Sequence, residues 1–178
     1  MRSRWLLIPL FLWLAGCATL RPTPVEFPPL ISRNLIAQQL SGLPLQVSLD
    51  PSWEMVHNRF GDYLWRGPMR VTGRPELRLT VSQDSRQPLP TLVEAAARLQ
   101  GVEAPTPAKT YVVAAHEGYC SSGFQGMAER KIVAIGWQEK DYTFLLLASW
   151  VDNEDGSALA TMIDAIKSSP PILEENRR

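Results

Sequence analysis

Two apolar stretches decide the fold: Lys131-Ile-Val-Ala-Ile-Gly-Trp137 and Tyr142-Thr-Phe-Leu-Leu-Leu-Ala-Ser-Trp150. The polar segment Gln138-Glu-Lys-Asp141 separates them, which predicts two long antiparallel strands joined by a turn. Residues 144–148 are apolar without interruption, a pattern typical of a strand that is covered on both faces of its sheet. We therefore expect the second strand to lie at the centre of an antiparallel sheet.

Shorter strands are predicted on the N-terminal side of this hairpin. Apolar and polar residues alternate over 45–49 and again over 77–81, the period-2 pattern of a half-buried strand. Further extended segments are expected at 53–56, 63–65, 69–71 and 111–116. Together with the hairpin and the helix that follows it, these strands predict one globular domain over residues 45–169.

Helical spacing marks two further segments. Thr91 and Glu94 fit a capping box ahead of an apolar face that ends at Leu99, and Gly101 offers a left-handed stop. The second helix is indicated by four apolar residues at i, i+3, i+4 and i+7, with Asp155 or Ser157 as its cap. These four are Leu159, Met162, Ile163 and Ile166. We expect Ile163 and Ile166 to pack over Phe144, Leu146 and Leu147. A weaker pattern predicts a short helix over 30–40.

The order of strands, helix, antiparallel strands and helix favours the α+β class. The turn from Pro51 to Trp53, the mid-chain helix, the long hairpin and the closing helix over 162–167 resemble the PsbP-like family across residues 45–168. That resemblance implies an α/β/α sandwich, in which helices cover an antiparallel sheet. It also implies a non-catalytic accessory protein that binds other proteins.

The N-terminal segment is typical of an exported protein. Arg2 and Arg4 precede an apolar run, residues 5–14, that is too short to span a bilayer, for which ~20 residues are needed. Leu14-Ala15-Gly16-Cys17 resembles the lipobox of bacterial lipoproteins. The resemblance implies removal of residues 1–16 and acylation of Cys17, and Ala18 implies an outer-membrane location facing the periplasm. An ordinary cleaved signal is the alternative.

The mature chain has little net charge. Loss of Arg2 and Arg4 leaves 16 basic against 18 acidic residues, a net charge of about −2, which gives no electrostatic reason to bind nucleic acid. Residues 17–44 hold the acylated Cys17, a proline-rich tether and the short helix, while 170–178 form a polar tail. With Cys17 acylated, Cys120 has no partner for a disulfide.

His116 and Cys120 form the candidate reactive site, because a thiol beside an imidazole can act as a nucleophile and its base. A buried apolar thiol with a hydrogen-bonded histidine is the structural alternative. His57, His116, Cys120 and Met127 carry side chains that suit a soft metal such as copper, but no spacing requires these residues to converge. Asp152, Glu154 and Asp155 resemble part of a calcium loop without its terminal glutamate and are expected to form a solvated turn. We expect no cofactor and no metal.

The preferred interpretation is an envelope lipoprotein that binds the bilayer through acylated Cys17 and a protein partner through its domain. A small-ligand binder with a pocket between sheet and helix is the first alternative, and a thiol enzyme using Cys120 is the second. The four tryptophans at 53, 65, 137 and 150 are expected to pack in the core and at its rim. Two or three of them exposed together would instead mark a contact surface.

Overall fold

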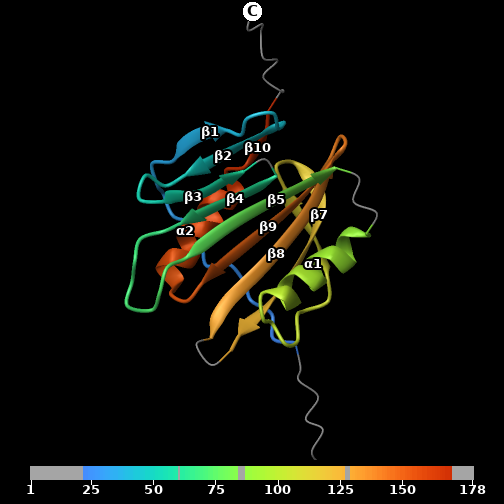
Figure 1. The fold of residues 1–178 in the computed structure, drawn as a ribbon. Coiled ribbons are helices and arrows are strands. Elements are labelled where there is room, and N and C mark those ends of the chain that lie inside the picture. The colour runs from blue at the N-terminus through green and yellow to red at the C-terminus, as the bar shows by residue number, and fades with distance from the viewer. Residues whose placement is uncertain (1–21, 60, 84–86, 127–128, 170–178) are drawn as a thin grey trace, which may run out of the picture.

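The computed structural model describes residues 22–59, 61–83, 87–126 and 129–169 of the 178-residue chain. Its main sheet is built from seven strands: β3 (Glu54–Arg59), β4 (Asp62–Arg66), β5 (Glu76–Gln83), β6 (Lys109–Val113), β7 (His116–Gln125), β8 (Arg130–Glu139) and β9 (Tyr142–Trp150). They are antiparallel in the order β3-β4-β5-β9-β8-β7-β6 (Figure 1). A second sheet holds β1 (Ile36–Gln39), β2 (Leu45–Leu49) and β10 (Lys167–Ser168), in the order β1-β2-β10.

The predicted hairpin is confirmed as β8 and β9, whose register pairs Trp137 with Phe144. The turn is shorter than expected, because residues 138 and 139 continue β8 and leave Lys140 and Asp141 to reverse the chain. Lys140 takes a positive φ of 54°, as a tight hairpin turn requires. Since β9 lies between β5 and β8, with three strands on either side, its central position is also confirmed.

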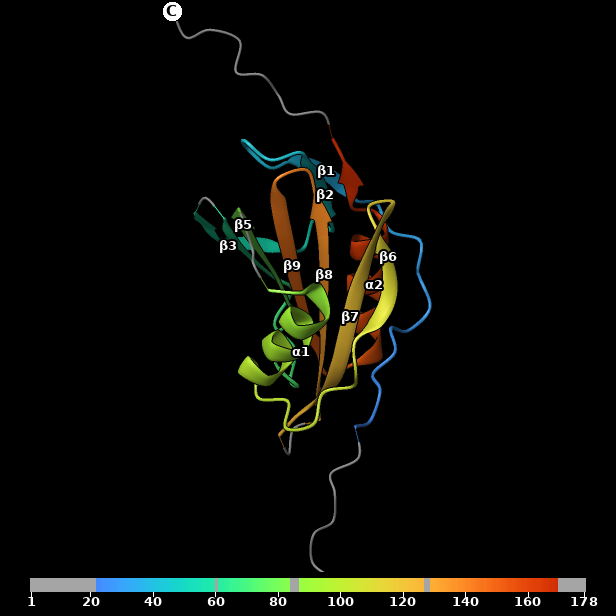
Figure 2. The ribbon, with the colours of Figure 1, turned by 90° about the vertical axis from the view of Figure 1, so that its right-hand side faces the viewer.

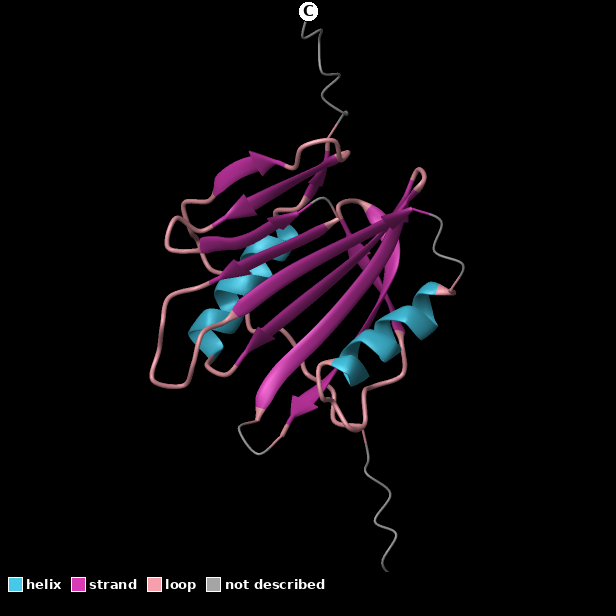
Figure 3. Ribbon diagram, in the orientation of Figure 1, coloured by secondary structure: helices cyan, strands magenta, loops and turns pink. Residues whose placement is uncertain are grey.

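The helices cover opposite faces of the main sheet. Helix α1 (Leu89–Leu99) packs over β7 and β8, and helix α2 (Asn153–Asp164) packs on the other face (Figures 2 and 3). We call the second side the α2 face. The predicted α/β/α sandwich is therefore confirmed.

Both predicted helix caps are wrong. α1 begins at Leu89, because Pro90 fits the first helical turn, where a missing N–H costs nothing. The Glu94 carboxylate accepts from the amide of Ala108 at 3.0 Å instead of reaching back to the helix start. α2 is capped by Asp152, whose carboxylate accepts from the amide of Glu154 at 2.8 Å.

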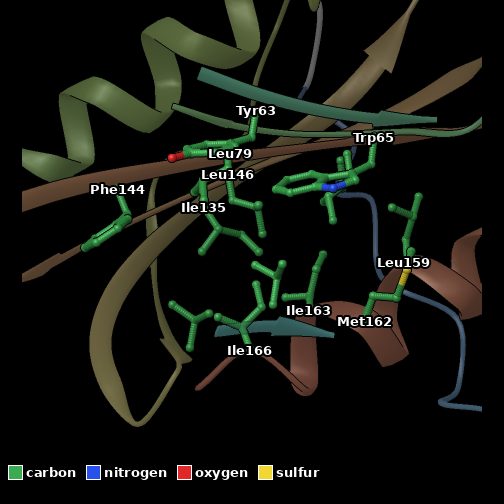
Figure 4. Packing of buried hydrophobic residues seen from close by; sticks show 14 of the residues in the cluster. Tyr63, Trp65, Leu79, Ile135, Phe144, Leu146, Leu159, Met162, Ile163 and Ile166 are labelled. Carbon is green, nitrogen blue, oxygen red and sulfur yellow. The ribbon is translucent and has the colours of Figure 1, made fainter. Parts of the chain in front are cut away.

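The core lies between β9 and its neighbours and α2 (Figure 4). Phe144 and Leu146 are fully buried, and Ile163 and Ile166 pack over them, as predicted. Leu147 is only half-buried, because it points to the opposite face, which α1 covers chiefly over β7 and β8.

The short helix predicted over 30–40 is wrong. This stretch is extended, and Ile36–Gln39 pairs with β2, so the sheet structure begins before the expected boundary at residue 45. A helix of this length is marginal in isolation, whereas pairing with β2 supplies hydrogen bonds to the same backbone. Leu40 is then buried in the core beside Leu45.

Residues 22–35, which combine part of the expected proline-rich tether with the start of the expected short helix, are docked on the α2 face. The Val25 amide donates to Ser122 Oγ at 3.0 Å, and the Phe27 ring stacks on Trp150 with ring centres 5.0 Å apart. Further along, the Ile31 amide donates to Thr161 Oγ1 at 3.1 Å. Extended, proline-rich backbone is present as predicted, but it forms part of the fold. Cys17 and the tail over 170–178 lie outside the described residues.

Candidate functional site

A cavity of about 360 Å³ lies on the α2 face, at the side of the sheet that ends in β7 and β6. One wall is the docked segment, which contributes Val25 and Phe27. The opposite wall is the sheet itself, with Tyr111 from β6, Cys120 from β7 and Val133 from β8. These side chains are brought together only by the fold, because they lie far apart in the sequence.

Strand register explains why the sheet residues share one face. Lys109 pairs with Cys120 across β6 and β7, and Ser122 pairs with Val133 across β7 and β8. Side chains directly opposite each other in a sheet point the same way, and every second residue follows them. The segment predicted as one strand over 111–116 is in fact the end of β6 and the start of β7, separated by Ala114 and Ala115, both with positive φ. Gly118 lies inside β7, which runs on to Gln125.

Two of the polar residues beside the cavity hold its walls together. The Ser122 amide donates to Thr106 Oγ1 at 2.9 Å, and Ser122 Oγ accepts from the Val25 amide. Both side chains are buried and hydrogen-bonded, so they fix the docked segment to the sheet. In contrast, Lys109, Tyr111 and Cys120 make no side-chain hydrogen bond or ion pair with any described residue.

The thiol and the imidazole of the predicted pair both lie on β7 and on the same face. Four residues along a strand span about 13 Å, so the two groups are not in hydrogen-bond contact. The His116 ring instead contacts Ser168 Oγ at 2.8 Å. Burial raises the pKa of the Cys120 thiol, and the charge of Lys109 only partly opposes that rise.

We expect Cys120 to react slowly with iodoacetamide in the folded protein at neutral pH. Only the thiolate reacts, and burial disfavours it. The rate should rise with pH beyond the ordinary thiol range, and denaturation should make alkylation fast. Mass spectrometry of the Cys120 peptide follows the reaction. Rapid alkylation of Cys120 in the folded protein at neutral pH, lost in the His116→Ala variant, would instead support the hypothesis of a thiol enzyme.

Three polar side chains meet near one end of β8. Ser168 Oγ lies 2.8 Å from His116 Nε2 and 3.0 Å from Glu139 Oε2, and that carboxylate oxygen lies 3.3 Å from the same ring nitrogen. A serine hydrolase needs the serine and the carboxylate on different ring nitrogens. Because both meet Nε2 here, the cluster ties β10 to β7 and β8 rather than forming a triad. Glu139, predicted in the turn, ends β8 and is buried.

The residues weighed as soft-metal ligands do not converge. His57 lies on β3 and approaches Asp62 at 3.5 Å, whereas His116 and Cys120 are on β7, near the opposite edge of the sheet. Met127 lies outside the described residues. Within the described part of the chain, no group of three His, Cys, Asp or Glu side chains could hold a metal ion.

The connection between β4 and β5 carries an exposed apolar tip. Residues 69–71, predicted as a strand, form part of this loop, and Met69 and Val71 are 73% and 107% exposed. The Arg70 amide donates to the Gly73 carbonyl at 3.2 Å, and the Gly73 amide donates back at 3.1 Å, which closes the tip. We call residues 67–75 the β4–β5 loop.

Arginines fix the β4–β5 loop to the body of the protein. The Arg70 guanidinium lies 3.3 Å from the Glu154 carboxylate and 3.6 Å from that of Asp155. Arg74 donates to the Gly67 carbonyl at 2.8 Å, and Arg130 donates to the Arg74 carbonyl at 2.7 Å. The acidic cluster considered as a calcium loop therefore serves to cap α2 and to pair with Arg70.

Comparison with known proteins identifies the architecture. No protein-family model matches the sequence, and no curated protein does. Solved structures do match: cyanobacterial PsbP from Synechocystis aligns with a TM-score of 0.56 at 10% identity, covering 78% of this chain and 94% of its own. The fold is that of PsbP.

Two more structures share the PsbP fold. The Ran-binding protein Mog1p of Saccharomyces cerevisiae aligns with a TM-score of 0.55 at 9% identity, over 77% of this chain and 96% of its own. LpqN of Mycobacterium tuberculosis, which is involved in cell envelope biogenesis, aligns with a TM-score of 0.52 at 10% identity, over 71% of this chain and 83% of its own. At such low identity the shared property is the fold, and the cavity and loop described above are features of this chain.

The tryptophans of this PsbP fold are core residues. All four in the described region are buried, which confirms the prediction and leaves no exposed tryptophan surface there. They are Trp53, Trp65, Trp137 and Trp150. No helix in the described ranges is both long enough and apolar enough to cross a bilayer.

Proposed function

We propose that this protein is a lipid-anchored, non-catalytic accessory protein of the bacterial envelope that binds a protein partner through the β4–β5 loop. The observation that carries the proposal is the exposure of Met69 and Val71 on a backbone held by arginines. Two fold neighbours support the type of function: one is a Ran-binding protein and another is involved in envelope biogenesis.

The loop has the properties of a protein-binding surface. Apolar side chains that face water gain free energy when a partner covers them, at roughly 25 cal/mol per Å². Because Arg70 and Arg74 already hold the backbone, less conformational entropy is lost on binding than for a free loop. Charged side chains next to the tip can form the polar rim that surrounds the apolar centre of many interfaces.

Photocrosslinking in the producing cell tests the partner proposal. A photoreactive residue at Val71 should give a discrete high-mass adduct with one protein. Val112 on β6 is the matched control, because it is also an exposed valine and lies on the edge strand of the main sheet, outside the β4–β5 loop. Met69→Asp should abolish the Val71 adduct without lowering stability. No adduct at Val71, or the same adducts at both positions, would contradict the proposal.

The anchor yields a separate prediction at Cys17. Cys17→Ser removes the sulfur that carries the diacylglycerol, so the protein should move from the detergent phase to the aqueous phase. Durable anchoring needs more than one acyl chain, each buried methylene contributing ~0.8 kcal/mol. Intact-mass spectrometry of the wild-type N-terminus should find acylated Cys17 as the first residue. A mature N-terminus without acyl mass would contradict the lipoprotein.

A further inference from the structure

The cavity on the α2 face has the chemistry of a ligand site. We propose that it binds a single-chain amphiphile with a carboxylate headgroup, of the free fatty acid class. The chain would lie against Val25, Phe27 and Val133, and the carboxylate would meet Lys109 and Tyr111. This inference does not depend on the β4–β5 loop or on the protein partner.

The size and walls of the cavity suit an apolar chain. Its volume of about 360 Å³ falls in the range of small-molecule sites, roughly 300–1,000 Å³. Six of its ten lining residues are apolar or aromatic: Pro24, Val25, Phe27, Tyr111, Cys120 and Val133. The cavity borders the main core, into which Val133 packs. Burying an alkyl chain there removes apolar surface from water on both sides.

Unused hydrogen-bond donors determine the headgroup. Tyr111 is half-buried and its hydroxyl has no hydrogen-bond partner among the described residues, and the exposed Lys109 has no carboxylate within ion-pair distance there. A carboxylate can accept from both donors at once, and such charge-assisted hydrogen bonds are stronger than neutral ones. The Thr106 and Ser122 hydroxyls are already hydrogen-bonded within the protein, Thr106 Oγ1 to the Ser122 amide and to Ser122 Oγ. They are therefore not the groups that would bind the headgroup.

Lys109 is the group in this cavity that attracts an anion, while Asp164 beside Tyr111 carries the opposite charge. Lys109 is the one basic residue of the lining, and the exposed Glu26, the one acid, makes no ion pair with it. Burial, helped by the nearby Cys120 and Asp164, raises the pKa of Tyr111, so the phenol keeps its proton as a donor. Lys109 would repel a cationic headgroup, and a neutral headgroup would gain no charge-assisted hydrogen bond from that exposed ammonium.

Titration calorimetry with three amphiphiles of equal chain length tests the headgroup. Dodecanoate, dodecanol and dodecyltrimethylammonium are each added to the mature protein below their micelle concentrations. We expect saturable one-to-one binding of dodecanoate, about tenfold weaker binding of dodecanol, and no measurable binding of the cation. Equal affinity for all three, or none for dodecanoate, would overturn the proposal.

Substitution of the lysine locates the headgroup in the cavity. Lys109→Met should weaken dodecanoate binding about tenfold and leave dodecanol unchanged. Lys167→Met is the matched control, since Lys167 is exposed on β10 and does not line the cavity. Bound dodecanoate should also slow alkylation of Cys120, which lines the cavity. Binding that ignores Lys109→Met and leaves Cys120 unprotected would place the ligand elsewhere and refute the assignment.

Discussion

Replacing Trp150 with alanine is expected to lower the free energy of unfolding by ~3–5 kcal/mol, the range for truncation of a buried aromatic side chain. Trp150 is fully buried at the end of the central strand, with Phe27 stacked on one side of its ring. A Cβ at Gly156 would lie 2.4 Å from the Trp150 indole nitrogen, so no residue larger than glycine leaves room for this ring. Urea unfolding followed by far-ultraviolet circular dichroism measures the change.

Trp150→Phe is the control that separates packing from hydrogen bonding. The indole N–H of Trp150 has no hydrogen-bond partner in the described part of the chain. Replacement by phenylalanine therefore reduces the volume of the side chain without removing a hydrogen bond. We expect it to cost no more than about half of the alanine effect, because much of the buried aromatic surface is kept. Equal losses in both variants would mean that the stack on Phe27 contributes little.

Leu146→Ala is expected to lower the free energy of unfolding by ~2–5 kcal/mol through lost burial and the cavity that it leaves. Leu146 is fully buried on β9, pairs with Ile135 on β8 and with Leu79 on β5, and faces α2. Its partners Leu79 and Ile135 are held in place by the paired strands β5 and β8, so the site cannot collapse easily around the smaller side chain. The same urea titration provides the measurement.

Leu99→Ala is the matched control for the central leucine. Leu99 ends α1 and is 85% exposed, so its truncation should change stability by no more than about 0.5 kcal/mol. A loss below about 1 kcal/mol in Leu146→Ala, or equal losses in the two variants, would show that β9 is not the centre of the core.

Long periodic segments made most of the fold predictable. The apolar patterns that predict the β8–β9 hairpin and α2 are local, and each one repeats several times along its strand or helix. The predicted short helix failed because a weak local pattern competed with tertiary pairing. Residues 30–40 resemble a short helix, but β2 supplies an adjacent strand edge, and Ile36–Gln39 pairs with it.

The cavity could not be predicted, because its walls come from distant parts of the chain. Cys120 was singled out for its chemistry, and the structure gives it a place in the lining, while His116 takes other partners. The docked segment had one local signal that was missed. Val25 and Phe27 alternate with polar or solvent-exposed residues, the pattern of a chain with one buried side, within a stretch whose prolines indicated only a tether.

The central claim is that residues 22–35 belong to the domain, since they form a wall of the cavity and cover Trp150. Native-state hydrogen exchange of the purified protein tests it most directly, read at the amides of Val25 and Ile31, which donate to Ser122 and Thr161. We predict that both amides exchange much more slowly than in an unfolded peptide, and that Trp150→Ala speeds their exchange. Exchange at unfolded-peptide rates in the wild-type protein would contradict the account and return this segment to the role of a free tether.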